Sequence, residues 1–258
     1  MGTQEWAVIT GASSGIGAEL ARLLSKRGYG IVLVARRRER LEELAAKLDG
    51  PSRIITADLG QTDECDRVMS EVADLDVSVF VNNAGFGDCG TFATTDEAKE
   101  LQMIDVNVRA LHLLTKRAVQ LFQARGAGRV LNVASSAGLM PGGPYMATYY
   151  ATKAYAASLS QAVAQELREQ PGCQDIHVSC LCPGPVDTEF NDVANVRFSL
   201  PGISAAYCAE CAVEGLFANR VLIVPSLRMK AACVLGRLAP RGLAVRIAGQ
   251  QQRRKLDA

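Results

Sequence analysis

Short apolar runs alternate along the chain with longer stretches in which apolar residues recur at helical spacing. The runs predict strands over about 7–10, 31–35, 53–57, 77–81, 129–133, 176–182 and 220–224. The longer stretches predict helices over about 16–27, 63–73, 97–123 and 149–169, and a charged helix with Leu41, Leu44 and Leu48 facing inward. Strands without polar alternation, separated by helices, are typical of a parallel sheet covered on both faces. With right-handed crossovers, the pattern predicts an α/β fold: a doubly wound, Rossmann-like parallel sheet with a nucleotide crevice at its switch point.

Length and composition favour a single domain over residues 1–258. The chain is 48% hydrophobic, which excludes a disordered protein, and no linker or internal repeat divides it. Its net charge of +1 gives no reason to expect a nucleic-acid partner. No run of about 18 apolar residues predicts a membrane span, and the N-terminus lacks the build of a signal peptide. We therefore expect a cytoplasmic protein.

The eight cysteines suit reduced thiols better than disulfides, because a chain of this length builds a sufficient core without them. Cys208-x-x-Cys211 resembles half of a zinc or redox site. A second Cys-x-x-Cys is missing, and His112 and His177 lie far away in sequence. We expect two thiols on a helix and no metal.

A glycine-rich loop separates the first predicted strand from the first helix. Glycine permits a sharp turn and a close approach to a pyrophosphate, which the N–H groups of the following helix then bind. The strand–loop–helix context predicts dinucleotide binding. The residues expected to bind it here are Gly11, Ser13, Ser14, Gly15, Ile16 and Gly17.

The end of the second strand predicts the choice of cofactor. Dinucleotide folds usually place an acid there, which binds the ribose diol and repels a 2′-phosphate. Here the strand ends in Ala35-Arg36-Arg37-Arg38, and a guanidinium binds phosphate. We predict NADP(H), with Arg36 on the phosphate. The alternative is that Arg36–Arg38 only begin a solvated helix, paired with Glu39, Glu42 and Glu43; we expect both to hold, with Arg38 in water.

Tyr149 and Lys153 are four residues apart, which puts them on one face of a helix. A free phenol is a poor base at neutral pH, and a nearby ammonium lowers its pKa. The pair is therefore a plausible acid/base catalyst for interconverting an alcohol and a ketone. The neighbouring Tyr150 has only Ala154 at the same spacing.

Four motifs together resemble the short-chain dehydrogenase/reductase family over about residues 5–190. They are Thr10-Gly11-x-x-x-Gly15-x-Gly17, Asn82-Asn83-Ala84-Gly85, the Tyr-x-x-x-Lys pair, and Asn132-Val133-Ala134-Ser135-Ser136-Ala137-Gly138. In the Gly-rich loop, Ser13 and Ser14 stand where many NADP-preferring relatives carry a basic residue. The resemblance implies that Asp58 and Leu59 border the adenine, that Asn83 and Gly85 line the adenosine side, and that Val186 and Thr188 meet the nicotinamide carboxamide.

The resemblance also implies catalytic roles. Tyr149 exchanges the proton, Lys153 lowers its pKa and touches the nicotinamide ribose, and Asn107 helps to hold a water that links the lysine to solvent. A serine polarises the reacting oxygen. Alignment on Ala137-Gly138 selects Ser135, whereas the usual spacing to the tyrosine selects Ser136. We favour Ser135, because the Gly142-Gly143 pair offers an insertion of one residue that lengthens the spacing to Tyr149.

Substrate residues are expected in a lid over about 189–207 and on the opposite side of the site. The lid contributes Phe190, Val193, Val196, Phe198, Leu200 and Ile203, and the other side Phe86, Met140 and Tyr145. An apolar pocket suits a lipophilic secondary alcohol or ketone, with a hydroxysteroid as the favoured example. A 3-oxoacyl thioester or a small carbonyl compound remains an alternative. A catalytically silent dinucleotide-sensing regulator is a further alternative, although such proteins usually lose the tyrosine or lysine.

The segment 226–258 forms a basic C-terminal extension, with eight Lys or Arg and one acid, Asp257. Leucines, Val245 and Ile247 interleave with these charges. Such a segment packs on the protein or a partner subunit, or makes weak contact with an anionic membrane surface. Small residues on helix 149–169 (Ala151, Ala154, Ala157 and Ser158) suggest a homodimer or homotetramer, as in relatives.

Overall fold

A seven-stranded parallel sheet lies at the centre of the computed structural model, which describes residues 4–194 and 202–256. Its order is β3-β2-β1-β4-β5-β6-β9. The strands are β1 (Glu5–Thr10), β2 (Gly30–Ala35), β3 (Ser52–Thr56), β4 (Asp76–Asn82), β5 (Gly128–Val133), β6 (Ile176–Leu181) and β9 (Leu222–Ile223). Two short strands, β7 (Val186–Asp187) and β8 (Ile203–Ser204), pair separately. The predicted doubly wound parallel sheet is confirmed.

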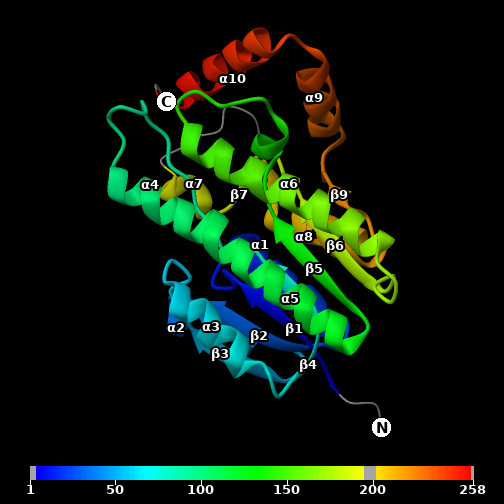
Figure 1. The fold of residues 1–258 in the computed structure, drawn as a ribbon. Helices are drawn as coiled ribbons and strands as arrows, with labels where there is room; N and C mark the ends of the chain where they lie inside the picture. The colour runs from blue at the N-terminus through cyan, green and yellow to red at the C-terminus, as the bar shows by residue number, and fades with distance from the viewer. Residues whose placement is uncertain (1–3, 195–201, 257–258) are drawn as a thin grey trace.

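Helices cover both faces of this sheet (Figure 1). They are α1 (Gly15–Lys26), α2 (Arg38–Ala45), α3 (Thr62–Glu71), α4 (Glu97–Ile104), α5 (Leu111–Arg125), α6 (Ala147–Glu169), α7 (Phe190–Val193), α8 (Ala205–Phe217), α9 (Leu227–Leu238) and α10 (Arg241–Leu256). One apolar core packs α1, α2 and α8 on the sheet, and the other packs α3, α5 and α6. Because the central strands are buried on both sides, their residues are mostly apolar, and the polar Ser78, Asn132 and Ser179 within them are buried as well.

The predicted helix over 97–123 contains a departure from α-helical geometry. Between α4 and α5 the chain forms a π-helical turn, Asp105–Ala110, and Asn107 lies within it. A π-turn adds one residue per turn and re-aims the side chains around it. The prediction of one continuous α-helix was wrong here, because hydrophobic spacing does not distinguish a single wide turn. The last strand is also shorter than predicted, with only Leu222 and Ile223 paired to β6.

The switch point of the sheet lies between β1 and β4, where the connections leave in opposite directions. The Thr10 hydroxyl accepts hydrogen bonds from the backbone N–H groups of Asn83 (3.0 Å) and Ala84 (3.1 Å). In return, the Asn83 amide donates to the carbonyls of Thr10 (3.0 Å) and Gly11 (3.1 Å). These bonds tie the Gly-rich loop to the loop after β4.

Helix α6 packs closely on the turn that follows β5. A Cβ atom on Gly138 would lie 2.2 Å from the carbonyl oxygen of Lys153, so only glycine permits this approach. On the outer side of α6, Ala151 and Ser158 are exposed, whereas Ala157 is buried in the chain's own core. Of the small residues predicted to meet a partner subunit, Ala151, Ala154 and Ser158 are at least partly accessible and stand at helical spacing, whereas Ala157 packs inside the chain.

The basic C-terminal extension folds into α9 and α10, which stand together at the top of the view (Figure 1). Both helices contact the segment between β5 and α6. Gly236 of α9 packs against Met140, and Gly249 of α10 packs against Pro144. Within the described ranges, no helix combines the length and apolar character that crossing a bilayer requires.

Candidate active site

A cavity of about 690 Å³ opens at the carboxyl ends of the central strands. It is lined by most of the residues predicted from sequence: Gly11, Ser13, Ser14, Gly15, Ile16, Arg36, Asp58, Leu59, Asn83, Gly85, Phe86, Ser135, Met140, Tyr149, Lys153, Val186, Thr188 and Phe190. These residues are spread over nearly 180 positions of the chain, and the sheet brings them together. Gly17, Asn107 and Tyr145 do not line it.

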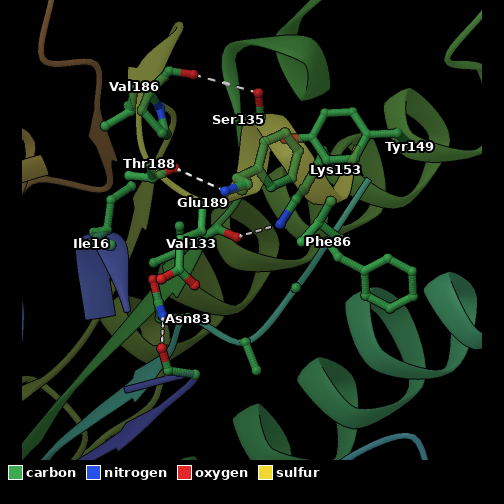
Figure 2. A pocket seen from close by; sticks show the side chains of 18 of the residues that line it. Ile16, Asn83, Phe86, Val133, Ser135, Tyr149, Lys153, Val186, Thr188 and Glu189 are labelled. Carbon is green, nitrogen blue, oxygen red and sulfur yellow. Dashed lines mark hydrogen bonds between the residues drawn. The ribbon is translucent and has the colours of Figure 1, made fainter. Parts of the chain in front are cut away.

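Ser135, Tyr149 and Lys153 lie on one side of this cavity, across from Ile16, Val186 and Thr188 (Figure 2). All three side chains are buried, with exposed fractions of 8%, 9% and 4%. Lys153 Nζ donates to the carbonyl oxygen of Val133 at 2.9 Å and lies 5.9 Å from the centre of the Tyr149 ring. Ser135 Oγ accepts from the N–H of Ala137 at 3.1 Å.

Burial dominates the protonation of this group. It raises the pKa of Tyr149 to about 12, and a hydrogen bond with Ser135 acts in the opposite direction. Burial also lowers the pKa of Lys153 to about 8. The expected lowering of the tyrosine pKa by the ammonium is not seen in this arrangement, because Lys153 Nζ is bound to Val133 rather than directed at the phenol oxygen. Ser135 and Ser136 both line the cavity, and of the two only Ser135 acts on the pKa of the phenol. The Ser135 hydroxyl donates to the carbonyl of Pro183 at 3.4 Å.

Asn107 acts on the backbone beside the cavity instead of facing it. Its side chain is fully buried, donates to the carbonyl of Phe86 (2.8 Å) and accepts from the N–H of Phe86 (3.1 Å). It also donates to Thr152 Oγ1 at 3.1 Å, and Thr152 donates to the Tyr149 carbonyl at 2.8 Å. The π-helical turn thus fixes the Gly85–Phe86 wall relative to α6.

The Gly-rich loop has the geometry that a dinucleotide requires. Gly11 and Gly15 adopt positive φ angles of 64° and 55°, which favour glycine. A Cβ on Gly17 would lie 2.4 Å from the Gly11 carbonyl oxygen, so this glycine serves the packing of the loop on α1. Since α1 begins at Gly15, its first N–H groups face the cavity and suit an anionic pyrophosphate. The residues present fit a dinucleotide.

The arginines after β2 divide into three roles. Arg36 is exposed, lines the cavity and makes no hydrogen bond or ion pair within the described chain. Arg37, which sequence reasoning did not select, donates to Ser13 and Ser14 (both 3.0 Å) and pairs with Glu189 at 2.9 Å. Arg38 pairs with Glu42 on the surface, as the solvated-helix alternative predicts. Only the fold shows that Arg37 bridges the Gly-rich loop to the start of the predicted lid.

The substrate side contains some predicted residues and adds others. Phe190 packs against the Tyr149 ring at a centroid distance of 5.5 Å. Tyr145 has φ 67° and lies outside the cavity lining, where its carbonyl accepts from Gly90. Val193 lines the cavity but Ile203 does not, and Val196, Phe198 and Leu200 fall outside the described residues. Met229, Gln251 and Gln252 from the C-terminal helices complete the wall.

Gln252 lines the cavity, and nothing in the sequence indicated it. Its side chain is only 4% exposed, and Nε2 donates to the Tyr150 hydroxyl at 2.6 Å. Its Oε1 is buried without a hydrogen-bond partner. Nothing in the run Gln250-Gln251-Gln252 marks the third glutamine, because only the docking of α10 decides which one faces inward.

The eight cysteines are free thiols. Cys208 and Cys211 are free thiols on α8, the first buried and the second half-buried. Over the ranges that the structure describes, His, Cys, Asp and Glu side chains form no group of three or more suited to a metal ion.

Comparisons with known proteins agree with this geometry. The chain is 28% identical to very-long-chain 3-oxoacyl-CoA reductase-A of Danio rerio over 82% of this chain and 67% of that protein. A short-chain dehydrogenase from Sphingobium yanoikuyae, solved in complex with NADPH, superimposes with a TM-score of 0.82 and 30% identity, covering 93% of this chain and 94% of that one. The bulky-bulky ketone specific alcohol dehydrogenase of Comamonas testosteroni superimposes with a TM-score of 0.78 and 28% identity, covering 94% of each chain.

A family model described as short chain dehydrogenase matches residues 5–197, which is most of the chain and includes the loop, the serine and the Tyr–Lys pair. The protein therefore belongs to the short-chain dehydrogenase/reductase family and is an oxidoreductase.

Proposed function

We propose that this protein is an NADP(H)-dependent oxidoreductase that interconverts a secondary alcohol and a ketone on a lipophilic substrate. The observation that carries the proposal is the burial of Ser135, Tyr149 and Lys153 on one side of a cavity whose other side is the Gly-rich loop. A bound nicotinamide supplies or accepts the hydride. The chain's own residues then need only orient the carbonyl and move one proton.

Tyr149 is the proton donor in the direction of reduction. With its pKa raised to about 12, the phenol keeps its proton at neutral pH and can give it to a carbonyl oxygen. Ser135, which is buried on the same side of the cavity, polarises the same oxygen and orients it. Lys153 holds α6 on β5 by donating to the Val133 carbonyl, which positions Tyr149 one turn earlier on the helix. If Nζ turned from Val133 toward the phenol when the cofactor is bound, the charge of the ammonium would favour the phenolate.

The preference for NADP(H) is supported by the cations after β2. No acid stands at the end of this strand, and Arg36 reaches the cavity without a partner in the described chain. Arg37 holds Ser13 and Ser14 from the same side. A 2′-phosphate between these guanidinium groups would be bound by charge-assisted hydrogen bonds. The Sphingobium yanoikuyae neighbour was solved with NADPH.

A bulky substrate fits the walls better than a small carbonyl compound. Phe86, Met140, Phe190 and Met229 provide apolar surface for a substrate of several rings. The Comamonas testosteroni neighbour is specific for bulky-bulky ketones. A 3-oxoacyl thioester is the second candidate, because the Danio rerio relative is a 3-oxoacyl-CoA reductase.

The unpaired Gln252 Oε1 favours a substrate with a second polar group. Leaving a buried carbonyl without a donor costs about 1–3 kcal/mol, so a ligand that offers a hydroxyl recovers this energy. A hydroxysteroid carries such a group at a distance from its reacting carbon. A simple alkyl ketone does not.

Tyr149→Phe should lower kcat by about 10²–10⁴-fold, because it removes the proton donor and leaves the ring packing in place. NADPH oxidation across a panel of ketones, including a steroid ketone and a 3-oxoacyl thioester, measures the effect. Tyr155→Phe, on the exposed side of α6, is the matched control. A wild-type protein that binds NADPH but turns over none of these compounds would instead be a silent regulator.

Arg36→Asp should lower the ratio of kcat/KM for NADPH to that for NADH by about ten- to hundredfold, since it replaces a phosphate ligand with a like charge. Arg38→Asp is the control, because Arg38 pairs with Glu42 away from the cavity. Steady-state kinetics with NADPH and with NADH measure this ratio for the wild type and both variants. Equal ratios in the Arg36 variant and the wild type would contradict the assignment.

Lys153 should make the stability of the cofactor-free protein depend on pH. Between about 8 and its ordinary 10.5, the unfolded chain binds a proton that the folded chain lacks, so the free energy of unfolding rises with pH over this window. The free energy of unfolding of Lys153→Met should not rise over this window. It should exceed that of the wild type mainly below pH 8, where the wild type buries a charged lysine. Urea unfolding of both proteins across the window measures the difference, and parallel curves would show that Lys153 is not desolvated.

Gln252→Leu should lower kcat/KM about tenfold for a ring ketone with a remote hydroxyl and leave its deoxy analogue nearly unchanged, because Leu accepts no hydrogen bond. Gln250→Leu, an exposed position on the same helix, is the control. Equal losses for both ketones would assign Gln252 a packing role through Tyr150 only.

A further inference from the structure

Large apolar side chains are exposed on both α9 and α10. We define this C-terminal face by six residues whose exposed fractions range from 46% to 78%: Leu227, Val234, Leu235, Leu238, Leu243 and Ile247. They are half of the twelve large apolar side chains that are exposed among the described residues. A cluster of this kind on two adjacent helices is unusual for a free surface.

The helical spacing shows that the cluster is a stripe with an opposite, inward side. Leu227, Val234 and Leu238 follow one another at intervals of seven and four, which aligns them along α9. On the other side of the same helix, Cys233 is buried and Met229 lines the cavity. On α10, Leu243 and Ile247 face outward whereas Gln252 faces inward.

Cations surround this stripe without acidic partners. Residues 226–256 contain eight Lys or Arg and no Asp or Glu. Six of the cations are exposed in the structure: Arg228, Lys230, Arg237, Arg241, Arg246 and Arg253. None of them forms an ion pair within the described part of the chain, whereas the arginines of α1, α2 and α3 do.

The charge of the molecule is separated between this face and the remainder. With Asp257, residues 226–258 carry +7, so residues 1–225 hold 20 of 28 cations and 26 of 27 acids and carry −6. A partner surface must therefore be anionic on the C-terminal side. Two copies meeting face to face would bring like charges together, which opposes a symmetric dimer through this surface.

We propose that the C-terminal face docks on an anionic lipid bilayer. Leucine and isoleucine side chains enter the boundary of the acyl chains, and the flanking Lys and Arg contact the headgroups. The acidic remainder of the molecule is repelled from the same membrane, which fixes the orientation. If the proposed lipophilic substrate is right, docking also places the wall formed by Met229, Gln251 and Gln252 beside the bilayer that dissolves it.

Pelleting of the full-length protein with lipid vesicles tests the docking without reference to catalysis. We expect binding to vesicles of phosphatidylcholine with phosphatidylserine, weaker binding to phosphatidylcholine alone, and release by salt. Lys230→Gln and Arg237→Gln should each lower the partition coefficient about fivefold. Leu235→Ser should lower it at least tenfold, since the apolar side chain no longer enters the boundary.

Matched controls use exposed residues of the same types elsewhere. Lys47→Gln on the surface beyond α2 and Leu101→Ser on α4 should bind as the wild type does, and thermal unfolding should show that every variant is folded. The proposal would be overturned by equal binding to vesicles with and without phosphatidylserine, or by an equal fall of the partition coefficient in the control variants. Self-association in sedimentation that Leu235→Ser abolishes, without vesicle binding, would also overturn it and make a second copy the occupant.

Discussion

The burial of one ammonium group constrains the geometry of the whole site. Lys153 is 4% exposed, and removing such an ion from water costs several kcal/mol unless the fold compensates it. The carbonyl of Val133 at the end of β5 provides one hydrogen bond, and the absence of a side chain on Gly138 lets α6 approach close enough to form it. Moving the helix outward would break this bond inside the core. Tyr149, one turn earlier on the same helix, is thereby held next to Ser135.

The same constraint sets the protonation of the pair in the cofactor-free protein. Desolvation disfavours the charged form of each group, so it lowers the pKa of the lysine and raises that of the tyrosine. The sequence motif alone suggested the opposite direction for the tyrosine, because spacing shows that two side chains share a helix face but not where their polar atoms point. Lys153 Nζ points at β5.

The parts of the site that the sequence predicted are those built by local rules. Apolar runs ending in Gly11, Asn82 and Val133 place loops at one edge of a parallel sheet, whatever the loops contain. The residues that reasoning missed depend on long-range packing. Arg37 contacts Glu189 across 152 positions, and the π-helical turn at Asn107 leaves no mark in the hydrophobic pattern.

The C-terminal helices show why composition could not assign their role. Sequence reasoning treated packing on the protein and contact with a membrane as alternatives, but a helix has two sides. Three residues after Gly249, which fits under Pro144, Gln252 reaches Tyr150, while Leu243 and Ile247 on the same helix remain outside. One helix therefore lines the cavity and also forms part of the outer surface. Because the ring of Tyr150 lies edge-on to that of Tyr149, with the centroids 6.5 Å apart, only Gln252 and Tyr150 separate α10 from the proposed proton donor.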